Sequence, residues 1–192
     1  MVSTPLSELE TIASLTERER LLIAASRGGD VPTASAPDKV AALLDAARVL
    51  EAAGARFALI GGVAVGIHSG VPRATIDTNL AVASTVDRAA LARALVRSGF
   101  QLVGEFPHSL NFRHASGEPV QLALDVGFDP MIERAERLEI AGVSIPFVRK
   151  ADLIEMKRRA AADPARRRSK ALRDQADVAL LEGDVPDPDE GW

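Results

Sequence analysis

The fold of this chain is decided by residues 57–82, which read FALIGGVAVGIHSGVPRATIDTNLAV. An apolar run at 57–60 ends on Gly61 and Gly62, and a segment of small residues continues to His68. A glycine pair between a strand and a helix lets backbone N–H groups approach an anion closely, and the helix N-terminus favours negative charge. This order of parts predicts an anion site at the start of the helix.

A second apolar segment, at 75–83, carries two polar residues, Asp77 and Asn79. On a β-strand, side chains two residues apart point to the same face of the sheet. Asp77 and Asn79 are therefore expected to reach one site together, with Thr78 facing away. Their oxygen atoms are of the kind that hard cations such as Mg²⁺ prefer as ligands.

Asp125 lies in another apolar segment, 120–127, which reads VQLALDVG and predicts a strand. A carboxylate buried in such a strand is costly unless it has a partner. One explanation is structural: Asp125 lies at a surface edge or caps a helix that starts near Pro130. The other explanation is functional: Asp125 is a metal-facing acid. We favour the metal-facing role, because Asp77 and Asn79 precede it in the chain.

The C-terminal third is strongly basic, and its pattern predicts helices at about 150–162 and 165–182. Ten basic residues occupy positions 149–173 and three acids interrupt them, which gives a local balance of +7. Such a run is usually a solvated helix face, but beside an anion site it suits a phosphate-rich acceptor. Lys157 lies on an apolar helical stripe, so its charged end needs an anion, either a phosphate or Asp174.

The remaining pattern gives the domain organisation. Residues 1–30 are predicted as a helical lead-in, 31–37 as a linker, 38–182 as one domain and 183–192 as an acidic flexible tail. The lead-in is either a partner-binding arm or a helix packed on its own domain, and we favour packing. Further helices are predicted at 38–53, 86–98 and 131–138, and short strands at 100–104, 109–114, 138–141 and 143–148.

The composition fits a single domain of ordinary globular type, with 192 residues, 47% hydrophobic and 26% charged. The chain has no cysteine, which excludes disulfides and thiolate metal sites and fits a cytoplasmic location. No apolar run approaches the roughly 20 residues of a membrane span, so no membrane partner is expected. The net charge of −4 gives no global sign of nucleic-acid binding.

The order of these motifs resembles the nucleotidyltransferase fold of DNA polymerase β-like enzymes. It is most similar to the branch that contains AbiEii and MenT-type toxins and the small antibiotic nucleotidyltransferases. The residues that carry the resemblance are Gly61, Gly62, Ala64, His68, Gly70, Arg73, Thr75 and Asp77, followed by Lys157, Arg173, Asp174 and Asp177. The resemblance implies an α/β (α+β) fold with a mixed, mostly antiparallel sheet flanked by helices, and with helices at the C-terminus.

The resemblance also implies a site. Its catalytic residues would be Asp77, Asn79, Asp125 and Lys157, of which Asp77, Asn79 and Asp125 would hold Mg²⁺ or Mn²⁺. Its nucleotide-binding residues would be Gly61, Gly62, Arg73, Thr75, Lys157, Arg173 and Asp174. The implied substrate is a nucleoside triphosphate (NTP).

Asn79 is a departure from the family pattern, which has a second Asp at this position. A carboxamide keeps an oxygen ligand but loses a negative charge, so we expect a damaged or absent second metal position. Three interpretations stay open: an engineered inactivating change, a natural loss that leaves a nucleotide-binding pseudoenzyme, or a site that works with one fully charged acid pair.

The function implied by the resemblance is transfer of a nucleoside monophosphate from an NTP to an acceptor. The leading hypothesis is a toxin of a toxin–antitoxin pair that modifies tRNA, with a cognate antitoxin as partner. The alternatives are nucleotidylation of a small hydroxyl compound such as an antibiotic, and a non-catalytic nucleotide-binding module. The basic run at 149–173 favours a polyanionic acceptor over an antibiotic.

Overall fold

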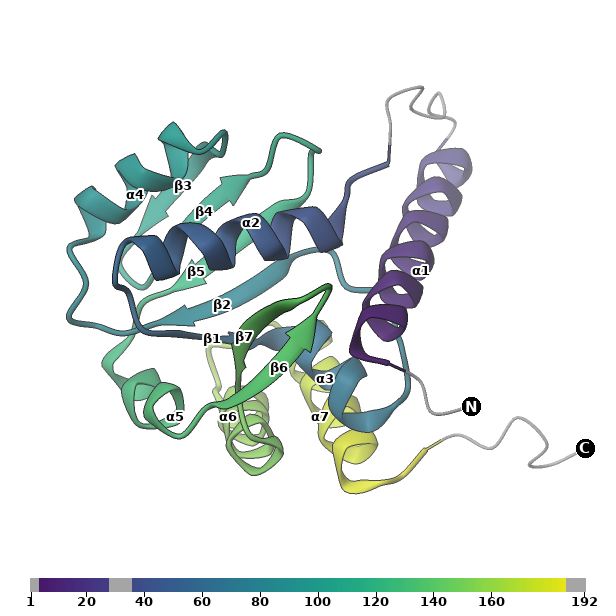
Figure 1. Cartoon of the computed structure of the whole chain (residues 1–192). Coiled ribbons are helices and arrows are strands. Elements are labelled where there is room, and N and C mark those ends of the chain that lie inside the picture. The colour runs from purple at the N-terminus through teal and green to yellow at the C-terminus, as the bar shows by residue number, and fades with distance from the viewer. Residues whose placement is uncertain (1–3, 28–35, 186–192) are drawn as a thin grey trace, which may run out of the picture.

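The structure is a computed structural model, and it describes residues 4–27 and 36–185 (Figure 1). Its centre is one seven-stranded sheet with the strand order β3-β4-β5-β2-β1-β7-β6. The strands are β1 (Phe57–Ile60), β2 (Thr78–Val82), β3 (Gln101–Phe106), β4 (Ser109–Arg113), β5 (Pro119–Ala123), β6 (Glu136–Ile140) and β7 (Val143–Phe147). Four strand pairings are antiparallel, and the β1–β7 and β2–β5 pairings are parallel. The expectation of a mixed, mostly antiparallel sheet is confirmed.

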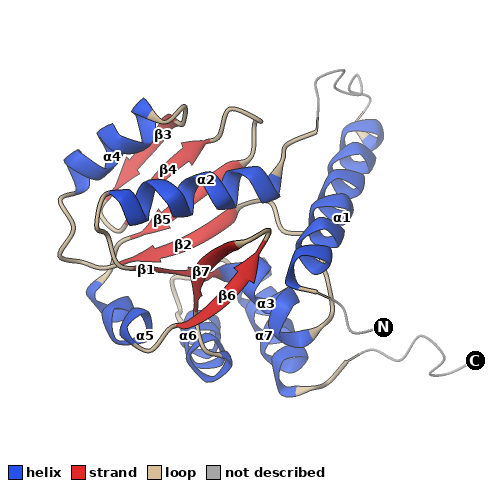
Figure 2. Ribbon diagram, viewed as in Figure 1, coloured by secondary structure: helices blue, strands red, loops and turns tan. Residues whose placement is uncertain are grey.

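Helices cover the sheet in two groups (Figure 2). Helices α2 (Lys39–Ala52) and α4 (Arg88–Arg97) lie along one face, and each begins at an aspartate, Asp38 or Asp87, whose side chain accepts a backbone N–H of the first turn. Helices α3 (Gly61–Ser69), α6 (Lys150–Ala162) and α7 (Arg168–Glu182) pack together near β1. The short η1 (Val126–Phe128) and α5 (Asp129–Glu133) follow β5.

One part of the core lies between the sheet and α2. Leu80, Leu122 and Leu110 are level with one another on β2, β5 and β4, and all three are fully buried. Because side chains alternate along a strand, the residues next to these leucines point to the opposite face of the sheet. The apolar pattern of the sequence therefore fixes which face carries the polar residues.

The predicted lead-in forms helix α1 (Pro5–Ser26), which packs on α2 and α3. Leu9 and Ile12 of α1 are fully buried, and the absence of a side chain at Gly66 lets Ile12 approach α3. The interpretation of the lead-in as a helix packed on its own domain is confirmed.

Parts of the predicted linker and tail, at 31–35 and 186–192, lie outside the described residues. Within the described ranges, none of the helices has both the length and the apolar character needed to cross a bilayer.

Candidate active site

The glycine turn sits where β1 passes directly into α3. Gly61 has a φ of 75°, and a Cβ atom there would lie 2.9 Å from the Asn79 side chain. A Cβ on Gly62 would lie 2.5 Å from the Thr75 hydroxyl oxygen. No side chain caps the first turn of α3, so its backbone N–H groups are available to an anion. The structure thus brings together Gly61, Gly62, Thr75 and Asn79, as the sequence predicted.

Asn79 belongs to a row of three carboxamides across the sheet. It is level with Gln121 on β5, which is level with Asn111 on β4, and the Gln121 amide nitrogen donates to the Asn111 side-chain oxygen at 3.1 Å. All three side chains are half-buried. We call Asn79, Gln121 and Asn111 the amide row. Gln121 and Asn111 were not predicted as site residues, although the alternation in VQLAL places Gln121 on the face opposite the buried positions of its strand.

Thr78 faces away from the amide row, as expected. Its hydroxyl donates to a Glu118 carboxylate oxygen at 3.1 Å, on the side of the sheet that α2 covers. Glu118 also forms a buried ion pair with Lys39 of α2. Burial raises the pKa of the Glu118 carboxyl above its usual value, and Lys39 opposes this rise.

Asp77 precedes the first residue of β2 and lies in a bend, so strand alternation does not set the direction of its side chain. Its charge contributes to the raised pKa of Glu118, which places it within electrostatic reach of that carboxyl. Asp77 is half-buried and lies at the end of the strand that carries Asn79.

Asp125 does not join this site, and the expectation that it lies opposite Asp77 is wrong. Thr78 is level with Val120 in the parallel pairing, so Asp77 lies at the start of the strand pair. Asp125 follows the end of β5, where it accepts the Gly127 N–H at 2.8 Å as the cap of η1. The predicted strand at 120–127 ends at Ala123, and Asp125 caps η1, whereas the helix expected to start near Pro130 is α5, whose N-cap is Phe128.

The donors at this site do not fit a two-cation centre. The positions that would share an ion with Asn79 carry amides, and Asp125 is at the other end of the strand pair. No group of three or more acidic, cysteine or histidine side chains within the described ranges is placed to hold a metal ion. Asp77, which directly precedes β2, is the one carboxylate of the predicted ligand set at this end of the strand pair.

A buried cluster of charges joins the glycine turn to α6 and α7. The Lys157 amine lies 2.9 Å from Asp174 and 2.8 Å from Asp177, and Arg73 reaches Asp177 at 2.6 Å. Arg166 completes the set with a 2.6 Å contact to Asp174. We call Arg73, Lys157, Arg166, Asp174 and Asp177 the ionic cluster. The prediction that Asp174 is a partner of Lys157 is confirmed.

Arg73 connects this cluster to the glycine turn, because a Cβ on Gly62 would come within 3.3 Å of its guanidinium. It also donates to the carbonyl oxygen of Ala74 at 3.1 Å. The loop that carries Arg73 and Thr75 is held from the other side by α1, where the Thr16 hydroxyl accepts the Thr75 N–H at 3.0 Å. The nucleotide-binding residues predicted around Gly62 therefore form one packed unit.

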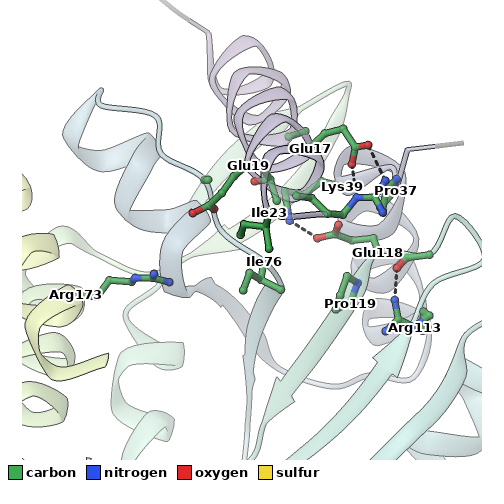
Figure 3. Close-up of a pocket in the computed structure, with 15 residues that line it drawn as sticks. Glu17, Glu19, Ile23, Pro37, Lys39, Ile76, Arg113, Glu118, Pro119 and Arg173 are labelled. Atoms are coloured by element: carbon green, nitrogen blue, oxygen red, sulfur yellow. Dashed lines mark hydrogen bonds and ion pairs between the residues drawn. The ribbon is translucent and has the colours of Figure 1, made fainter. Parts of the chain in front are cut away.

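Arg173 makes no ion pair with any residue of the described ranges. It is exposed and lines a cavity of about 470 Å³ between α1, the segment before β2 and the β4–β5 turn (Figure 3). Figure 3 shows Lys39 and Glu118 paired at this cavity, with Ile23 of α1 close to Ile76. The structure thus separates Arg173 from its chain neighbour Asp174, which the sequence analysis had assigned to the same nucleotide site.

His68 has a structural role at the end of α3. Its Nε2 donates to the Val148 carbonyl oxygen at 2.7 Å, and its ring stacks on Phe147 with 4.2 Å between centroids. Burial lowers the pKa of His68, so the neutral ring is favoured. These contacts leave the ring packed against β7 and the residue after it.

The sheet order and the glycine turn define a fold of the nucleotidyltransferase class. An antigenic nucleotidyltransferase-like protein from Paracoccidioides brasiliensis shares it, with 23% identity, a TM-score of 0.52 and 79% of each chain covered. ANT(2")-Ia in complex with adenylyl-2"-tobramycin is similar at 16% identity and a TM-score of 0.53, covering 76% of this chain and 90% of that one. Identities this low show the fold alone.

The family can be stated more narrowly. The family described as "Nucleotidyl transferase AbiEii toxin, Type IV TA system" matches residues 42–190, and the chain belongs to it. A comparison with curated proteins finds no match.

Proposed function

We propose that this chain binds an NTP at the Gly61–Gly62 turn and transfers its nucleotidyl group to a hydroxyl of a phosphate-rich acceptor, tRNA, with release of pyrophosphate, as the toxin of a toxin–antitoxin pair. The observation that carries the proposal is the packing of α3, which begins at the glycine turn, against α7, which begins in the basic run. A nucleotide phosphate and a polyanionic acceptor would then meet on adjacent elements. A cognate antitoxin is the partner that this proposal implies.

The acceptor surface consists of the exposed side chains at the start of α7. Arg167, Arg168 and Lys170 are exposed, and none of them makes an ion pair with another described residue. Arg166 is already bound to Asp174, so it is excluded from this surface. Unpaired surface arginines suit phosphate contacts, because each contact releases counterions from the nucleic acid.

Filter binding of tRNA across a salt series tests this surface. For the wild type, log K should fall by roughly 0.7–0.9 per phosphate contact for each tenfold rise in salt. Arg167→Glu/Arg168→Glu should flatten the slope and leave NTP affinity nearly unchanged. Arg93→Glu/Arg97→Glu is the charge-matched control, because both arginines are exposed on α4, on the face that α2 covers. Equal slopes of log K against the logarithm of the salt concentration for the wild type and Arg167→Glu/Arg168→Glu would contradict the proposal.

A second candidate is nucleotide binding without transfer, and the carboxamides at Asn79 and Gln121 favour it. Incubation with NTPs labelled at the α-phosphate and total tRNA separates the two candidates. Label in tRNA from the wild type supports transfer. If tRNA is labelled only by Asn79→Asp/Gln121→Glu, the wild type binds the nucleotide without transferring it. If neither protein labels tRNA although both bind NTP, the result counts against transfer.

A further inference from the structure

The sheet face that carries the amide row is free of carboxylates over three adjacent strands. Residues at alternate positions of β2, β5 and β4 share this face. They are Asn79 and Ala81 on β2, Gln121 and Ala123 on β5, and Asn111 and Ser109 on β4. These six side chains are three amides, two alanines and a serine, so none of them is a carboxylate, and Asp77 lies before the first residue of β2.

Geometry explains why these positions matter. Neighbouring strands lie about 4.8 Å apart, so side chains level with each other on β2 and β5 can share one ion. Gln121 is the residue on β5 that is level with Asn79. Asp125 lies four residues further along the chain, about 13 Å in an extended strand, and it cannot serve the same ion.

The Asn79 carboxamide is free to bind a ligand. It makes no hydrogen bond to any of the residues that the structure describes, whereas Gln121 donates to Asn111. A carboxamide has two N–H donors and an acceptor oxygen. Asn79 therefore offers two donors next to Gly61, and Gln121 offers one more.

We propose that this chain holds the phosphates of its nucleotide directly through the Asn79 and Gln121 amides, in place of the divalent-cation centre that the family resemblance implies. The inference rests on the proposed NTP site at the Gly61–Gly62 turn. Amide N–H groups donate to phosphate oxygens without a bridging cation, as backbone N–H groups do at a helix N-terminus. The ligand is an NTP that needs no bound Mg²⁺ for affinity.

Two calorimetric titrations of the full chain test the inference. The first measures NTP binding in EDTA and again with excess Mn²⁺, and the second measures Mn²⁺ alone. We expect NTP to bind the wild type in EDTA, and Mn²⁺ alone to show no saturable binding. The second titration needs no nucleotide, so it reports on the metal site independently of the proposed function.

Asn79→Asp/Gln121→Glu restores two carboxylates on adjacent strands with little change of shape. We expect it to gain Mn²⁺ affinity by at least about tenfold, because cation affinity follows the charge of the ligands. Asn79→Asp/Asn111→Asp is the matched control, since it adds the same charge two strands apart, about 9–10 Å, which one ion cannot bridge. Circular dichroism of both variants shows whether they keep the fold. If a double variant does not fold, the single Asn79→Asp variant is titrated with Mn²⁺ in its place.

The outcomes separate the inference from the function on which it rests. If NTP binding to the wild type is lost in EDTA and restored by Mn²⁺, the inference is wrong and the nucleotide site stands. Saturable Mn²⁺ binding by the wild type alone would also overturn it. If no NTP binds under either condition, the proposed function fails and the direct amide contact fails with it.

Discussion

The amide row and the ionic cluster are the two polar regions beside the glycine turn, and they are built in opposite ways. The amide row is half-buried and neutral, whereas the ionic cluster buries Lys157, Asp174 and Asp177 almost completely. Nucleotidyl transfer uses concentrated charge to hold phosphates and cations. In this chain the concentrated charge lies in the packing between helices, and the sheet face where a cation centre would form has none.

This difference shows that a buried charge near a site is not by itself a catalytic charge. Lys157 matches the lysine of the family pattern, but its amine is neutralised by two carboxylates in this structure. Because two buried carboxylates hold this amine, we expect substitution of Lys157 to cost stability. The comparison can be tested by changing each region and measuring stability.

The largest expected effect is that of Lys157→Ala. Removing one partner from a buried ion pair costs about 3–5 kcal/mol, and here we expect about 3 kcal/mol because Asp174 and Asp177 each keep an arginine. Urea unfolding measures the loss, and Lys170→Ala, an exposed change on α7, is the control with an expected effect below about 0.5 kcal/mol. Equal stability of the two variants would mean that the ionic cluster is not structural.

Gly62→Ala tests the junction between the two regions. In an unobstructed helix the change would stabilise the protein by about 1 kcal/mol. The added methyl group would instead lie 2.5 Å from the Thr75 hydroxyl oxygen, so we expect a loss of about 2 kcal/mol. Gly66→Ala is the comparison variant and should cost less, since the one atom closer than 3.0 Å to its methyl group would be the end of the Ile12 side chain. A gain in thermal stability for Gly62→Ala would contradict this close packing.

Gln121→Ala tests the amide row as a structural element. It removes a neutral, half-buried hydrogen bond to Asn111, which is worth about 1 kcal/mol. A loss as large as that of Lys157→Ala in the same urea titration would mean that the row is a packing feature. NTP affinity of Gln121→Ala, measured in EDTA, should fall even though the fold is kept.

The smallest effect is expected for Asp125→Asn. The asparagine keeps an acceptor for the Gly127 N–H, and the contact of Asp125 with His108 is largely exposed, so stability should change by less than about 0.5 kcal/mol. NTP affinity should be unchanged, because Asp125 lies beyond the end of β5. A large loss of NTP affinity in Asp125→Asn would mean that Asp125 belongs to the nucleotide site, and it would contradict the contrast between the amide row and the ionic cluster.

Features that depend on local pattern can be read from the amino-acid sequence. The glycine pair, the helix that follows it and the polar residue Asn79 on an apolar strand are all read from neighbouring positions. The apolar stripe around Lys157 required an anion, and Asp174 was one of two candidates. The mixed, mostly antiparallel sheet came from the family resemblance of these motifs.

Which polar side chains meet depends on contacts between distant segments. Gln121 and Asn111 join Asn79, and Asp125 does not, because the register of β5 against β2 sets the level of each residue. Alternation along a strand is a local property with a period of two residues, so the sequence shows it. Register is fixed by pairing between segments about 40 positions apart, Asn79 and Gln121 among them, and it is set by how the whole sheet packs on α2.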